Sequence, residues 1–186
     1  MQYIRAIISI AACAVIFIGA AQAQNEYTGV KFCAACHKKG KGGTAYAVWE
    51  KSAHAKAYET LKGEKAKKYA KERGLKTPPH ESEACLKCHV PGGGTAKNVE
   101  KTFKIEEGIT CEVCHGPASK YKVLHSKGDL AKSKKAGLIQ GDKTSKFCEK
   151  CHNEESPGFK GFDFEERWAK IEHKLPPKKE AKKEEK

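Results

Sequence analysis

Four copies of one short pattern, Cys-x-x-Cys-His, constrain this chain more than any other feature of its sequence. They run from Cys33 to His37, Cys85 to His89, Cys111 to His115 and Cys148 to His152. Two cysteines three residues apart lie on one side of a helical turn, so their sulfurs can reach the two vinyl groups of one porphyrin edge. The histidine that follows lies under the iron as an axial ligand. The pattern predicts four covalently attached haems c.

Zinc sites and disulfides are the alternatives for paired cysteines. A zinc site needs no histidine directly after every cysteine pair, whereas all four pairs have one. Chance would give on the order of 0.02 matches to the haem-attachment pattern in a chain of this composition. Haem is therefore favoured. The predicted attachment residues are Cys33, Cys36, Cys85, Cys88, Cys111, Cys114, Cys148 and Cys151, and the predicted proximal iron ligands are His37, His89, His115 and His152.

Four further histidines are available for the opposite face of each iron: His54, His80, His125 and His173. The single methionine is Met1, so histidine-methionine ligation, which raises the potential of small cytochromes c, is excluded. Four irons and four spare histidines favour bis-histidine ligation. Such iron changes oxidation state with little rearrangement and has no vacancy for a substrate, which is the chemistry of an electron carrier.

The first 23 residues have the pattern of a secretory signal peptide. Arg5 precedes an apolar stretch that reaches Ala21, and Ala21 to Ala23 fits the small-residue rule for cleavage. We expect export to the periplasm, with an extracellular location as a further possibility. A membrane anchor would need more than the apolar run of about 15 residues. A lipoprotein signal at Cys13 would leave part of that run on the wrong side of the cysteine.

About 163 residues remain after the leader, enough for one domain but poor in apolar side chains. We expect one tetrahaem domain over residues 24–175 and a disordered charged tail over 176–186. The net charge of +13 comes almost entirely from lysine, and only three arginines occur in the chain. Nucleic acid is not an expected partner of an exported protein of this kind.

The pattern of apolar residues and of Gly and Pro predicts several helices. One runs from Thr44 to about Leu61, and a charged one runs over residues 63–73. A third includes His125, and a last one covers residues 162–174, whereas 128–146 is predicted to be a polar connector.

Lysines gather near the second of these helices: Lys62, Lys65, Lys67, Lys68, Lys71 and Lys76. They form either a docking face for an acidic redox partner or a solvated surface that keeps the protein soluble.

Several stretches around the motifs resemble the tetrahaem cytochrome c-554 family. They are the run around His54 from Trp49 to Ala57, the loop from Cys85 to Gly92, the segment from Gly108 to Pro117 with His125 downstream, and the late segment that ends at His173. The likeness covers most of the chain beyond the leader and extends to motif order and spacing.

The resemblance implies a mainly α fold in which short helices and loops pack around four haems, with little β structure. It also implies crossed ligation. His125 would be the distal ligand of the first haem, His54 of the fourth and His173 of the third. The implied role is a relay between a periplasmic oxidoreductase and other cytochromes.

His80 departs from the family, in which the second haem is five-coordinate. It lies five residues before Cys85, and five extended residues reach about 17 Å, enough to bring an imidazole round a porphyrin edge. We predict that His80 closes the second haem. The alternatives are a haem of a neighbouring chain, or solvent.

Three functions follow as hypotheses. The leading one is an electron carrier between redox proteins, with no small-molecule substrate. The second is reduction of nitric oxide or another small nitrogen oxide at an open second haem. The third is a subunit of a haem-wired filament or electron conduit.

Overall fold

The computed structural model describes residues 24–38, 43–140 and 144–173. The predicted leader and the predicted tail fall outside these residues. Within them the chain forms short helices joined by loops, and an isolated bridge joins Tyr27 to Val99. The predicted mainly α class is thereby confirmed. In the described part, no helix has the length and apolar character needed to cross a bilayer.

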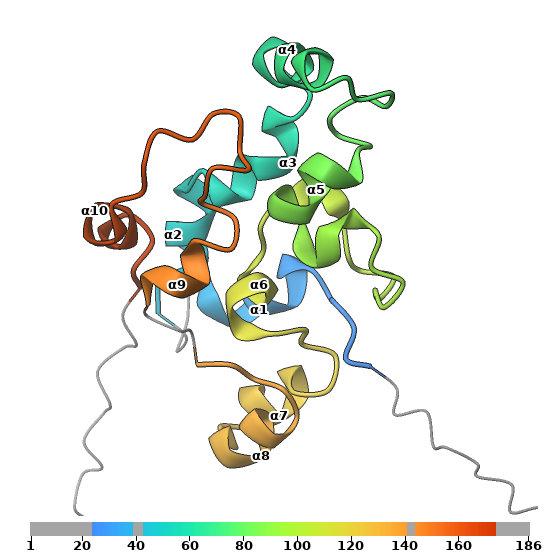
Figure 1. Ribbon diagram of the computed structural model, residues 1–186. Helices are drawn as coiled ribbons and strands as arrows, with labels where there is room; N and C mark the ends of the chain where they lie inside the picture. Colours follow the sequence, from blue (N-terminus) through green and yellow to red (C-terminus); the bar gives the residue numbers. More distant parts are fainter. Residues whose placement is uncertain (1–23, 39–42, 141–143, 174–186) are drawn as a thin grey trace, which may run out of the picture.

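Four short helices carry the cysteine motifs: α1 (Val30–His37), α5 (Glu83–His89), α6 (Cys111–His115) and α9 (Ser145–Cys148). They gather in the middle of the molecule, with α4 (Glu64–Glu72) at the top and α7 (Lys122–Ser126) and α8 (Leu130–Lys135) at the bottom (Figure 1). The fourth motif continues past α9 as a turn, because the amide of His152 donates to the carbonyl of Cys148 at 3.0 Å.

The helix predicted from Thr44 to Leu61 is broken, so that prediction was wrong as one element. It consists of α2 (Ala45–Lys51), the 3₁₀ turn η1 (His54–Lys56) and α3 (Ala57–Thr60). The break falls at Ser52, whose ψ of 161° is extended. Both the amide and the hydroxyl of Ser52 donate to the carbonyl of Trp49, a local arrangement by which serine competes with helix continuation.

Two other predicted helices are present as α4 and α7, whereas the polar connector was mispredicted in part. It contains α8, which begins where the Asp129 side chain accepts a hydrogen bond from the amide of Lys132 at 2.9 Å. The last predicted helix is shorter than expected. It is α10 (Phe164–Ala169), capped by Asp163, and His173 lies beyond its end. The two remaining 3₁₀ turns are η2 (Pro91–Gly94) and η3 (Ile105–Glu107).

The apolar core of the described residues is small. Its one cluster of buried residues joins α3 to α5 and consists of Tyr58, Leu61, Leu86 and Val90. Elsewhere the most deeply buried side chains include polar ones, above all Glu112 and Thr28, each 1% exposed. The fold therefore depends on specific polar contacts, and on what the cysteine motifs bind, more than on side-chain packing alone.

Candidate haem-binding sites

Three of the four motif histidines face a second histidine. The ring pairs are His37 with His125, His54 with His152, and His115 with His173, and each pair has its ring centroids 6.0 Å apart. Two metal–nitrogen bonds of about 2 Å each, plus the distance from each nitrogen to its ring centre, come to about 6 Å. The separation is that of two imidazoles that bind one metal ion from opposite sides.

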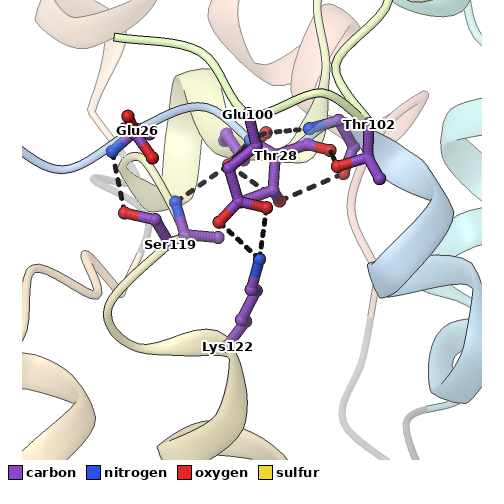
Figure 2. Close-up of polar contacts among 9 residues, drawn as sticks. Glu26, Thr28, Glu100, Thr102, Ser119 and Lys122 are labelled. Atoms are coloured by element: carbon purple, nitrogen blue, oxygen red, sulfur yellow. Dashed lines mark hydrogen bonds and ion pairs between the residues drawn. The ribbon is translucent and has the colours of Figure 1, made fainter.

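The first pair is positioned by α1 and α7. The His37 and His125 rings are parallel within 1°. One turn before His125, the Lys122 ammonium binds both carboxylate oxygens of Glu100, at 2.6 Å for Oε1 (Figure 2). The same ammonium lies 5.5 Å from the centre of the Phe32 ring on α1. The ion pair is largely shielded, with side chains 18% and 26% exposed. Lys122 thus fixes α7 against the first motif.

The segment that holds Glu100 is itself fastened to the start of the described chain. The hydroxyl of Thr102 donates to the carbonyl of Thr28 at 2.8 Å, and the amide of Glu26 donates to the Ser119 hydroxyl at 2.8 Å (Figure 2). Together with the Tyr27–Val99 bridge, these bonds join three stretches that are remote in sequence. The stretch before the first motif therefore becomes a support for α7.

His54 is positioned by a close approach of two backbones. The amide of Ile109 donates to the carbonyl of His54 at 3.0 Å, and the Trp49 indole donates to the carbonyl of Ile109 at 2.7 Å. Gly108 permits this approach, since a Cβ there would lie 2.6 Å from the His54 carbonyl and its φ is +65°. The residues just before the third motif thereby set the place of the histidine that faces the fourth. His152 also stacks on Phe162, with ring centroids 4.8 Å apart.

Two motif histidines have their inner ring nitrogen on a backbone carbonyl. His89 Nδ1 lies 2.6 Å from the carbonyl oxygen of Ala57, and His115 Nδ1 lies 2.9 Å from that of Ile139. A carbonyl can only accept, so Nδ1 carries the proton and Nε2 is left as the metal-binding nitrogen. Burial is the main cause of a lowered pKa at four of the histidines: His54, His115, His125 and His152. Each therefore favours the neutral form that metal ligation requires.

His80 lies in a different environment. Its ring packs edge-on against that of Tyr58, with centroids 6.4 Å apart, and its Nε2 is 3.5 Å from a carboxylate oxygen of Glu81. Among the described residues no ring pair joins it to His89. The structure thus places three spare histidines opposite motif histidines and the fourth beside a buried tyrosine, so His80 as a ligand of the second haem stays a prediction.

The cysteines of different motifs lie close together. The neighbouring Cys111 lowers the pKa of the Cys33 thiol, and Cys88 adds to burial in raising the pKa of the Cys151 thiol. Cys148 is close enough to Cys114 to help raise its pKa, although burial is the larger cause. In space the motifs therefore follow one another in the order first, third, fourth, second.

The residues fit a haem at each motif. All eight cysteines of the motifs are free thiols, as thioether formation requires, and they are paired on single turns. In the described ranges no group of three or more His, Cys, Asp or Glu is arranged to hold a metal ion by itself. Haem iron needs only two axial ligands from the protein, and the facing imidazoles supply that number at three motifs.

Comparison with known proteins bears on the same region. The family model described as cytochrome c554 and c-prime matches residues 32–116. Cytochrome c-554 of Nitrosomonas europaea is 34% identical over 127 residues, which are 66% of this chain and 49% of that protein. Over this region the chain is similar to the cytochrome c-554 family. The matched part spans about half the length of this curated relative.

A solved structure extends the likeness to the fold. Cytochrome c554 of Nitrosomonas europaea in its reduced state matches with a TM-score of 0.50 and 29% identity, covering 82% of this chain and 80% of that one. A cytochrome c-554 family member binds haem c covalently, and four haems agree with the family. The predicted family resemblance is confirmed.

Several residues that organise the sites were not predicted from the sequence. Lys122 and Glu100 are ordinary members of a lysine-rich and glutamate-rich chain, and no local signal distinguishes them. Glu112 and Glu149 each follow the first cysteine of a motif, yet Glu112 is buried and Glu149 is exposed. Only their tertiary surroundings separate the two.

Proposed function

We propose that this protein carries electrons between redox proteins in the periplasm, through four covalently bound haems. The supporting observation is the set of three imidazole pairs at 6.0 Å. Two imidazoles on one iron leave no position for a substrate, and both oxidation states keep the same ligands. When bound, haem supplies a one-electron ferric/ferrous couple.

The polypeptide contributes the order and closeness of the centres. Contacts between cysteines of different motifs indicate that the four motifs are arranged in space in the order first, third, fourth, second, so each motif has a neighbour. An electron accepted at either end of this series has a neighbouring centre available at each step. We propose residues 24–175 as the tetrahaem domain, cleavage of the leader after Ala23, and all eight cysteines of the motifs as attachment residues.

The axial ligands are proposed as His37 with His125, His152 with His54, and His115 with His173, with His89 as the proximal ligand of the second haem. The test is the full chain produced in a host that attaches haem c. We expect the mass of four haems beyond the processed polypeptide, mainly low-spin ferric spectra, and midpoint potentials below those of histidine-methionine cytochromes. A colourless protein with no added mass would refute the proposal.

The partners are proposed to be other redox proteins, with acidic docking surfaces as one option. Three lysines near α4 already pair with nearby glutamates: Lys62 with Glu59, Lys67 with Glu64, and Lys68 with Glu72. Such local pairing reduces the field that this face offers to a partner. Rates of electron transfer that fall with ionic strength would support electrostatic docking, and rates that do not change would support a merely solvated surface.

A second candidate function is binding and reduction of a small nitrogen oxide at the second haem. The observation in its favour is the place of His80, which packs on Tyr58 instead of forming a ring pair with His89. Carbon monoxide added to the reduced protein distinguishes the two functions. Binding at one haem in four without displacement of a ligand favours the reductase, whereas no binding favours a pure carrier with His80 on the iron.

A further inference from the structure

A buried carboxylate joins the first and third motifs. Glu112 lies between Cys111 and Cys114 on α6, and its side chain is 1% exposed. Its Oε1 accepts from the amide of Thr28 and the amide of Ala118, both at 2.8 Å, and its Oε2 accepts from the amide of Gly29 at 2.8 Å. The Thr28 hydroxyl donates to it as well, at 3.2 Å.

This arrangement defines the charge state of Glu112. Every hydrogen-bond partner of its two oxygens is a donor, so a proton on the carboxyl would have to displace one of them. The pKa of Glu112 is raised overall, because burial outweighs the hydrogen bonds from the amides of Thr28, Ala118 and Gly29. No ion pair to Glu112 is found among the described residues. The side chain is therefore a carboxylate stabilised by backbone dipoles, without a neutralising cation.

A second carboxylate contacts the same stretch of backbone, from Thr28 to Val30. Glu107 Oε2 accepts from the amide of Val30, the first residue of α1, at 2.9 Å. Two glutamates, one just before the third motif and one within it, thus bind the backbone just before the first motif. The thiols of Cys33 and Cys111 meet beside them, which places both haem attachment points next to this negative charge.

We propose that the buried negative charge of Glu112 lowers the reduction potentials of the first and third haems relative to those of the second and fourth. A nearby anion favours ferric over ferrous iron, and net charge is one of the factors that set such potentials. The effect is strong because water does not screen the group. The inference depends on the haem attachment proposed above.

The fourth motif contains a matched control. Glu149 occupies the same position after the first cysteine, Cys148, but its side chain is exposed. Solvent and salt screen an exposed charge over short distances. Two glutamates at equivalent motif positions should therefore differ in their effect on the haem potentials only because one is buried.

The test is a spectroelectrochemical titration of the haem-loaded full chain, with all four haems first confirmed by mass. At an effective dielectric constant of about 20, a unit charge about 12 Å from a redox centre changes its equilibrium about tenfold. Glu112→Gln is expected to raise two of the four potentials by about that factor, or about 59 mV for one electron. Glu149→Gln is expected to move none of them, and Glu112→Asp, which keeps the charge, is expected to restore the wild-type values.

Unchanged potentials in fully loaded Glu112→Gln, or an equal shift in Glu149→Gln, would overturn the inference. So would a shift in Glu112→Asp as large as in Glu112→Gln, since loosened packing would then be the cause. If Glu112→Gln does not load haem, Glu107→Gln removes the neighbouring charge, and the same two potentials must rise. A wild-type protein without haem would instead refute the proposed function and leave no potential to measure.

Discussion

The regions around the second and third motifs have the same local chemistry but different surroundings. In the third, His115 faces His173, and Glu112 ties α6 to the segment before the first motif. In the second, the only cluster of buried apolar residues in the described part packs against α5, and His89 has no facing histidine there. One region is held by a polar network and has a second histidine opposite its motif histidine, whereas the other is held by apolar packing. The same Cys-x-x-Cys-His pattern therefore serves two kinds of site.

Removal of a facing histidine should have the largest effect. His54→Ala leaves His152 as the only protein ligand proposed for the fourth haem, so we expect one haem in four to become high-spin in the ferric protein. Electron paramagnetic resonance of the oxidised protein measures the change. A high-spin fraction no larger than that of the wild-type protein would show that the His54–His152 pair does not ligate iron.

The apolar cluster of the second region predicts a loss of stability without a change of ligand. Leu86 is 5% exposed and contacts the cluster from α5. Leu86→Ala should lower the free energy of unfolding by about 2–5 kcal/mol, because it creates a cavity. Denaturant titration measures this, with Leu130→Ala as the control at a site that is 43% exposed. Equal losses in the two variants would mean that the cluster is not a core.

The polar contacts that follow the third motif, between α7 and Glu100, predict a smaller loss of stability. Lys122→Met removes a shielded ion pair with Glu100, so we expect a loss of about 2 kcal/mol in unfolding free energy. A growing high-spin fraction should accompany it as α7 loosens and His125 leaves the iron. Lys67→Met breaks an exposed pair and should do neither. A Lys122→Met protein with wild-type stability and spectra would show that the network does not hold α7.

The smallest effect is expected at His80. With its ring against Tyr58, as in the structure, His80→Ala would leave the spin states of the ferric protein unchanged, in contrast to His54→Ala. The measurement is the spectrum of the ferric His80→Ala protein at neutral pH, compared with that of His54→Ala. A new high-spin signal in His80→Ala would establish His80 as the sixth ligand of the second haem, as the sequence predicts.

Local patterns predicted the individual helices unevenly. Charged residues between Gly63 and Gly74 were sufficient to predict α4. The helix over Thr44–Leu61 was overestimated, because the hydrogen bonds of Ser52 to Trp49 depend on local backbone choices that periodicity does not reveal. The helix α8 was missed, since its Asp129 cap lies in a stretch with little apolar periodicity.

The sequence by itself predicts the number of haem sites, the cysteines that form them and the histidine next to each, because one turn of helix contains all three groups. Which distant histidine faces which motif, and which of two equivalent glutamates is buried, were decided by the tertiary structure. The family resemblance anticipated the three histidine pairings, but residue spacing did not. Such choices depend on contacts between segments remote in sequence, and no local pattern of residue types records which segments will meet.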